Sequence, residues 1–216
     1  MLAGFCNMRW TKDQIKAMDK LSRLNLINSI TGIKPANLIG TKSEKGYDNL
    51  AIISSVVHMG SNPALIGFFT RPTEDVRRDT YNNIVSTGFY TINHAPVELL
   101  QNAHYTSAKF DEEVSEFDQC GFNAEYVSGF SAPFVKESPI KIGMKLVDQQ
   151  QISLNNTILM IGEVVLIEVV DEAIEEGNHL NLEKSLSSGI SGLNSYYSIK
   201  KEAQFPYARV AELPKF

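Results

Sequence analysis

Residues 60–84, with the sequence GSNPALIGFFTRPTEDVRRDTYNNI, predict a strand, a basic turn and a helix in direct succession. Residues 64–70 are a short apolar run of the kind that forms a strand. The turn after this run carries three arginines, which are Arg71, Arg77 and Arg78. Asp79 and Thr80 are residue types that cap a helix N-terminus, and Gly88 is placed to end that helix.

Arginines gathered before a helix are a candidate anion site. The free N–H groups of the first helical turn and the positive end of the helix dipole both favour a negative charge. Guanidinium groups can also bind a phosphate through two parallel hydrogen bonds. A charged turn that is merely solvated is the alternative, and this stretch alone leaves both interpretations open.

The composition is that of an ordinary globular chain of 216 residues, enough for one large domain or two small ones. The net charge of −5 provides no overall basic field to hold nucleic acid or an anionic membrane. We therefore expect neither nucleic acid nor a membrane among the partners, and any anion site must be local.

The two cysteines, Cys6 and Cys120, are too few for a disulfide scaffold and lack the spacing of a zinc site. We expect both to be reduced thiols in a cytoplasmic protein. No run approaches 18 uninterrupted apolar residues, and the N-terminus has no long apolar segment of a signal peptide.

Three strand-like segments follow one another at residues 36–41, 49–59 and 64–70. Their short connections predict an antiparallel meander, because a parallel pair needs a long crossover. Further strands are expected at residues 89–93, 140–148, 157–170 and, more briefly, 180–183. Gly162 marks a bend or bulge in the longest of them.

Helices are predicted at residues 11–24 and 97–105, from apolar spacing and from Pro96 respectively. Residues 106–135 are a loop-rich region, and its acidic residues 111–118 are expected to form a solvated face. The whole pattern is typical of a mainly β protein, a β-barrel with helices in its connections.

We expect one domain over residues 1–216. It would contain an N-terminal helix at 11–24, a barrel core at about 33–170 and a C-terminal extension at 171–216.

Two small polar clusters could contact a ligand. Ser54 and Ser55 lie within the Ile- and Val-rich segment 49–59, so one hydroxyl would point into the barrel and need a partner. That partner is either the backbone or the polar edge of a ligand. The second cluster, Thr106, Ser107 and Lys109, is either a surface loop or a set of donors to a ligand phosphate or carbonyl.

Other kinds of site find no support in the sequence. The four histidines, His58, His94, His104 and His179, form no metal-binding pattern. Nucleophile-elbow and Walker motifs are absent as well. We therefore predict no metal site.

Residues 33–41, residues 49–51 with Ser54, and residues 61–63 resemble the opening strands of the flavin reductase-like family, which includes the flavoredoxins. The motifs around Arg71, Arg78 and Gly88 also match this family in order. So do residues 115–117, 121–122, 137–139 and 161–165. The resemblance implies the FMN-binding split β-barrel, an antiparallel, Greek-key-like barrel.

This resemblance further implies a homodimer with FMN bound non-covalently near the subunit interface. The flavin would carry the hydride or electrons, so no protein residue need act as acid or base. NAD(P)H is the implied co-substrate, and a small molecule or a protein is the redox partner.

Carried over position by position, Ser54 and Ser55 fall where family members touch the flavin ring or ribityl chain. Arg78 and Thr80, with Asp79 between them, fall at the FMN phosphate, and Arg71 lies close in sequence. Thr106, Ser107 and Lys109 fall in a loop that approaches the flavin.

Several positions depart from the pattern of the family. Ile52 and Ile53 replace an aromatic-rich segment, and Val57 stands where Asn is common. Leu166 and Ile167 stand where many members have His. Two alternatives therefore remain, an FMN-binding electron carrier without its own substrate and a split-barrel binding protein with a repurposed pocket.

Overall fold

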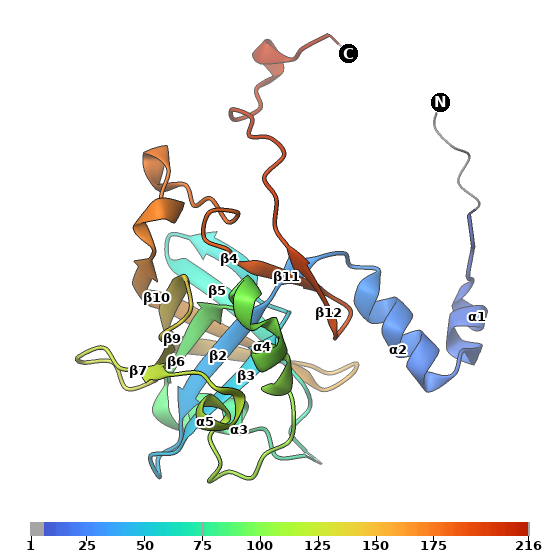
Figure 1. Cartoon of the computed structure of the whole chain (residues 1–216). Coiled ribbons are helices and arrows are strands. Elements are labelled where there is room, and N and C mark those ends of the chain that lie inside the picture. The colour runs from blue at the N-terminus through green and yellow to red at the C-terminus, as the bar shows by residue number, and fades with distance from the viewer. Residues whose placement is uncertain (1–6, 75, 216) are drawn as a thin grey trace.

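The computed structural model describes residues 7–74 and 76–215, and its centre is a curved antiparallel sheet of seven strands (Figure 1). The order of the strands is β3-β2-β6-β9-β10-β5-β4. Their bounds are β2 (Asn37–Lys42), β3 (Asp48–Ile53), β4 (Val57–Ser61), β5 (Ala64–Thr70), β6 (Phe89–His94), β9 (Ile140–Ile152) and β10 (Thr157–Val169). The predicted mainly β, antiparallel fold is confirmed.

The two edge strands of this sheet, β3 and β4, are consecutive in the chain. Only residues 54–56 join them, so the sheet must curl until its two edges approach each other. The single strand predicted at 49–59 is therefore wrong, and so is the simple meander. The apolar run misled the prediction because Ile53 and Val56, on either side of the break, both pack against the core of the barrel.

The interior of the barrel is filled by one cluster of buried side chains, which are Ile39, Phe68, Ile84, Tyr90, Ile92, Met144, Ile158 and Met160. Gly162 lies against this core, where a Cβ atom would collide with the hydroxyl of Tyr90. The register of β10 against β9 shifts between Ile161 and Gly162, so the bulge predicted at Gly162 is confirmed.

A second cluster lies outside the barrel, between β2, β3 and the short helices α4 (Leu100–Tyr105) and α5 (Glu116–Cys120). A 3₁₀ turn, η1 (Val97–Leu99), precedes α4, so the helix predicted after Pro96 is confirmed in that place. Helix α5 and the two-residue strands β7 (Ala124–Glu125) and β8 (Phe134–Val135) lie within the region expected to be loop.

Helix α3 (Asp79–Thr87) ends at Gly88, which has a φ of 76°, as predicted. Its N-cap residue is Arg78, without a side-chain capping bond, so the predicted capping by Asp79 and Thr80 is wrong. The reason is that both side chains are engaged elsewhere. Asp79 pairs with Arg77, and the Thr80 hydroxyl accepts a hydrogen bond from Asn49.

The helix predicted at residues 11–24 is two helices, α1 (Lys12–Ala17) and α2 (Lys20–Ser29). Met18 has an extended ψ of 147°, and the Asp19 carboxylate caps the second helix by accepting from Leu21 and Ser22. Neither helix buries a residue, and Figure 1 shows both standing apart from the barrel.

A small sheet of β1 (Lys34–Pro35), β11 (Ser188–Ser191) and β12 (Ser195–Ser198) packs beside the barrel, and the sequence did not predict it. The strand expected at 180–183 is wrong, because only an isolated bridge joins Ile174 to Leu180 there. The 3₁₀ turns η2 (Asp171–Ala173), η3 (Glu176–Asn178) and η4 (Val210–Glu212) complete the described elements. None of the described helices combines the length and the apolar character that spanning a membrane requires.

Candidate functional site

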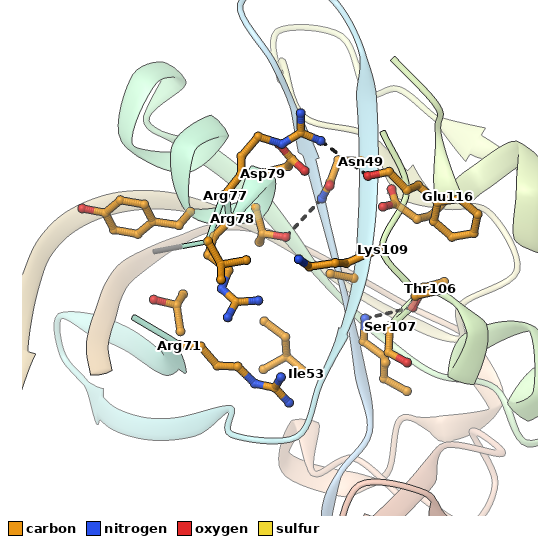
Figure 2. A pocket seen from close by; sticks show the side chains of 18 of the residues that line it. Asn49, Ile53, Arg71, Arg77, Arg78, Asp79, Thr106, Ser107, Lys109 and Glu116 are labelled. Atoms are coloured by element: carbon orange, nitrogen blue, oxygen red, sulfur yellow. Dashed lines mark hydrogen bonds and ion pairs between the residues drawn. The ribbon is translucent and has the colours of Figure 1, made fainter. Parts of the chain in front are cut away.

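A cleft of about 610 Å³ opens beside the curled edge of the sheet (Figure 2). Three parts of the chain supply most of its wall, namely the end of β3 with residues 54–55, residues 69–71 with 76–81, and residues 106–111. All nine residues predicted to bind a cofactor line this cleft, which are Ser54, Ser55, Arg71, Arg78, Asp79, Thr80, Thr106, Ser107 and Lys109. The structure thus brings three distant segments of the sequence together.

The cleft contains a cluster of positive charges. Figure 2 shows Arg71, Arg78 and Lys109 extending into the same space from opposite walls. Among the described residues, no carboxylate forms an ion pair with any of these three cations. Burial, together with the positive charge of Arg71, lowers the pKa of Arg78 below its ordinary value. The two guanidinium groups therefore repel each other, and a bound anion would relieve that repulsion.

Arg77 is held differently from its neighbour Arg78. Its Nε lies 2.8 Å from Asp79 Oδ1, and its terminal nitrogen donates to the carbonyl of Phe110 at 3.4 Å. Asp79 therefore neutralises Arg77, and Arg77 in turn ties the start of α3 to the loop that carries Lys109. Arg78, by contrast, donates only to the carbonyl of Pro72, at 3.3 Å, among the described residues.

Four polar side chains form a hydrogen-bonded network below the start of α3. Asn49 Nδ2 donates to Thr80 Oγ1 at 3.1 Å and to Thr41 Oγ1 at 3.2 Å, and Asn83 Nδ2 donates to Thr41 Oγ1 at 3.1 Å. Thr41 is fully buried. Because Thr80 Oγ1 accepts from Asn49, its own hydroxyl proton remains available to donate toward the cleft.

Three of the predicted hydroxyl groups bond to the backbone. Ser55 Oγ accepts from Phe69 N at 3.0 Å and donates to Phe69 O at 3.1 Å. It thus satisfies the two backbone groups that a neighbouring strand would otherwise bond. Thr106 Oγ1 accepts from Ile52 N at 2.9 Å and donates to Ala103 O at 2.7 Å. Ser107 Oγ donates to His104 O at 2.7 Å. These three residues shape the wall of the cleft.

Glu116 is a residue of the cleft that the sequence analysis missed. It was expected in a solvated acidic face, but it is buried, and its Oε2 accepts from the backbone N–H of Leu50 at 2.9 Å. Burial raises the pKa of this carboxyl, and the hydrogen bond from Leu50 opposes the rise. The helical spacing of Glu116 with the apolar Cys120 was the available signal for a buried face.

The described residues contain no group of three or more His, Cys, Asp or Glu side chains that could hold a metal ion. Cys120 is a buried free thiol, and Cys6 lies outside the described residues.

Comparison with known proteins identifies the family of this chain. The model of the flavin reductase like domain matches residues 33–185. The chain belongs to the flavin reductase like domain family. This match runs from β1, across all seven strands of the barrel, to Ser185, and the resemblance noted in the sequence is confirmed.

Solved structures of similar proteins agree with the split-barrel fold. A proposed flavin reductase with a split barrel domain from Shewanella frigidimarina NCIMB 400 is 44% identical, with a TM-score of 0.89, over 94% of this chain and 100% of that chain. Nitrilotriacetate monooxygenase component B from Bacillus cereus is 17% identical, with a TM-score of 0.80, over 94% and 100% of the two chains. Flavoredoxin of Desulfovibrio vulgaris (Miyazaki F) is 21% identical, with a TM-score of 0.70, over 82% and 92%. The last two likenesses concern the fold alone.

Proposed function

We propose that this protein is a flavin-dependent oxidoreductase that binds FMN non-covalently in the 610 Å³ cleft. The observation that carries this proposal is the convergence of Arg71, Arg78 and Lys109 on the same space within the cleft. A phosphate there would offset the mutual repulsion of the guanidinium groups and receive charge-assisted hydrogen bonds. Membership of the flavin reductase like domain family makes the phosphate of a flavin nucleotide the favoured anion.

The residues of the cleft suit the two ends of FMN. Arg78, Lys109 and the available hydroxyl proton of Thr80 suit the phosphate, and Arg71, whose charge acts on Arg78, lies on the side toward Ile53. Asp79 pairs with Arg77 next to the proposed phosphate position, so its carboxylate would not face the phosphate directly. The flavin ring then lies toward residues 52–55 and Ser107, where the wall is a mixture of apolar side chains and small hydroxyl groups.

Bound FMN would supply the hydride and electron transfer. The protein's own residues bind the phosphate, position the ring against the end of β3 and limit the access of water. This division of roles requires no side chain that gains or loses a proton, and we assign no catalytic residue.

Titration of the purified protein with FMN and with riboflavin tests the phosphate site. Riboflavin has the same ring without the phosphate, so we expect FMN to bind at least about tenfold more tightly, as a charge-assisted contact predicts. Equal affinities would contradict the assignment of Arg71, Arg78 and Lys109.

We further propose NAD(P)H as the electron donor and a small molecule or a protein as the acceptor. Steady oxidation of NADH or NADPH with excess free FMN would support a reductase. A protein that binds FMN without such turnover would instead be an electron carrier, and one that binds no FMN would have a repurposed pocket.

We also propose that the protein is a homodimer, as the family resemblance implies. Val57, Met59 and Phe69 are exposed apolar residues on the outer face of β4 and β5, and Phe69 also lines the cleft. Gly67 lies on the same face, where a Cβ atom would meet the Met59 sulfur at 2.6 Å, so the Met59 side chain lies over Gly67 and adds to an exposed apolar patch. A second copy of the chain covering this face would place the cleft near the interface.

Sedimentation equilibrium tests this assembly. We expect a dimer for the native protein and a monomer for Met59→Lys. Leu154→Lys is the matched control, because Leu154 is 95% exposed in the turn between β9 and β10. Dissociation by both substitutions, or by neither, would contradict the proposed interface.

We retain the proposals of a single domain over residues 1–216 and of a cytoplasmic location. The buried free thiol of Cys120 is compatible with a reducing compartment.

A further inference from the structure

Two elements outside the family match also border the cleft. The match covers residues 33–185, whereas Asn28 lies in α2 and Leu193 lies in the turn between β11 and β12. Both residues line the cleft. The part of the wall that they form is therefore an addition to the matched core of the family.

The hairpin of β11 and β12 is firmly attached to the barrel. Ser188 donates its backbone N–H to Ala95 O at 3.2 Å and its hydroxyl to the same carbonyl at 2.8 Å. Ile190 is buried in the cluster outside the barrel. These contacts of β11, together with the packing of Tyr196 of β12 against the same cluster, fix the hairpin and the position of its turn, which carries Leu193.

The hairpin reaches the end of the cleft away from Arg77 and Asn49. Tyr196 OH lies 3.0 Å from His104 Nδ1, and the His104 carbonyl accepts from Ser107, a residue of the cleft wall. In Figure 2, Ser107, Ile53 and Arg71 lie toward one end of the cleft, whereas Arg77 and Asn49 lie toward the other. Leu193, three residues before Tyr196 at the turn of this hairpin, therefore borders the cleft on the side of Ser107, where the proposed flavin ring would lie.

We propose that Leu193 is a specificity-determining residue that forms an apolar outer wall at the ring end of the cleft. A reactant that takes a hydride directly from the ring must come within about 3–3.5 Å of it, and a planar compound does so by lying against the ring. Leu193 is 40% exposed, so its side chain is free to contact such a reactant and to limit the reactant's width. The reactant class that fits this wall is a narrow, planar, apolar ring compound. This inference rests on the proposed function.

The first experiment measures the position of Leu193 without turnover. Leu193→Cys is made in a Cys6→Ser background, and alkylation by a maleimide is timed with and without saturating FMN. We expect FMN to slow alkylation at position 193 by at least about fivefold, because the rate depends on access to the thiol. Leu154→Cys, at the exposed turn between β9 and β10, should react at the same rate with and without FMN.

The second experiment measures selection by width. Two electrons and two protons pass from the dithionite-reduced flavin to a quinone, which becomes the hydroquinone. We expect Leu193→Trp to lower the rate with 2-methyl-1,4-naphthoquinone by about tenfold relative to 1,4-benzoquinone. Leu193→Ala should shift the ratio in the opposite direction, and Leu154→Trp should leave it unchanged.

Failure of this inference is distinguishable from failure of the proposed function. Absence of FMN binding to the native protein would remove the proposed function itself. FMN binding with unchanged alkylation of the Leu193→Cys variant, or with an unchanged quinone ratio in both Leu193 variants, would overturn the role of Leu193 alone.

Discussion

Arg77 and Arg78 are adjacent arginines at the start of α3, yet the structure predicts different consequences for their loss. Arg77 is neutralised by Asp79 at 2.8 Å, whereas Arg78 has no carboxylate partner among the described residues. Replacement of each by Gln removes one positive charge from the same turn. The pair is therefore a matched comparison for the proposed phosphate site.

The expected magnitude follows from the contact that Arg78 would make. A charge-assisted hydrogen bond to a phosphate contributes about 1.5–3 kcal/mol. Since about 1.4 kcal/mol is a factor of ten, Arg78→Gln should weaken FMN binding by roughly 10- to 150-fold. Arg77→Gln should weaken it by less than about fivefold, because surface ion pairs contribute only about 0–1 kcal/mol.

The assay is a titration of each variant with FMN and with riboflavin, followed by flavin fluorescence, at low and at high salt. Riboflavin affinity should be the same in the native protein and in Arg78→Gln, because riboflavin lacks the phosphate. The salt dependence of FMN binding should also be smaller in Arg78→Gln. Equal losses in the two variants, or a parallel loss for riboflavin, would refute the reasoning.

Three further predictions concern the network, the buried acid and the core. Asn49→Ala should weaken FMN binding by about three- to tenfold and leave riboflavin binding unchanged, because Thr80 loses the donor that orients its hydroxyl; Thr80→Val in the same background should then add little. Glu116→Leu should lower the free energy of unfolding in urea by about 1–3 kcal/mol, because the N–H of Leu50 loses its partner. Glu116→Gln keeps that acceptor. Burial raises the folded-state pKa of Glu116, so the stability that the protonated carboxyl contributes is lost as the pH rises from 4.5 through the raised pKa. The free energy of unfolding of Glu116→Gln should therefore increase relative to that of the native protein as the pH rises. A native protein that becomes more stable relative to Glu116→Gln as the pH rises to neutral would contradict this sign. Gly162→Ala should cost about 1–3 kcal/mol by overpacking against the Tyr90 hydroxyl, and Tyr90→Phe should restore part of that loss in thermal unfolding. An additive double variant would show that the collision is not the cause.

The sequence predicted elements whose signals are local. The apolar run of β5 and the glycine that ends α3 need no distant partner to be recognised, and both lie where they were expected. The break at Ser54 was missed because the residues on both sides face the same core, so the apolar pattern continues across it. Asp19 was missed as a helix cap because, with Lys16 and Lys20 close to it in the sequence, it resembles part of an ordinary exposed helix face.

The candidate site was predictable as a set of residues but not as a set of bonds. All nine residues line one cleft because the matched order of motifs reflects the fold. Ser55 and Thr106 accept hydrogen bonds from backbone groups 14 and 54 residues away, and no local pattern predicts such pairs. The burial of Glu116 and the position of Leu193 in the wall of the cleft likewise depend on segments that meet only in the folded chain.

The most direct test of the central claim is the visible absorption spectrum of the purified protein, with mass analysis of any cofactor released on denaturation. FMN bound in the cleft predicts a yellow protein with the bands of oxidised flavin and a released cofactor with the mass of FMN. A colourless protein that stays free of flavin after incubation with excess FMN would contradict the account.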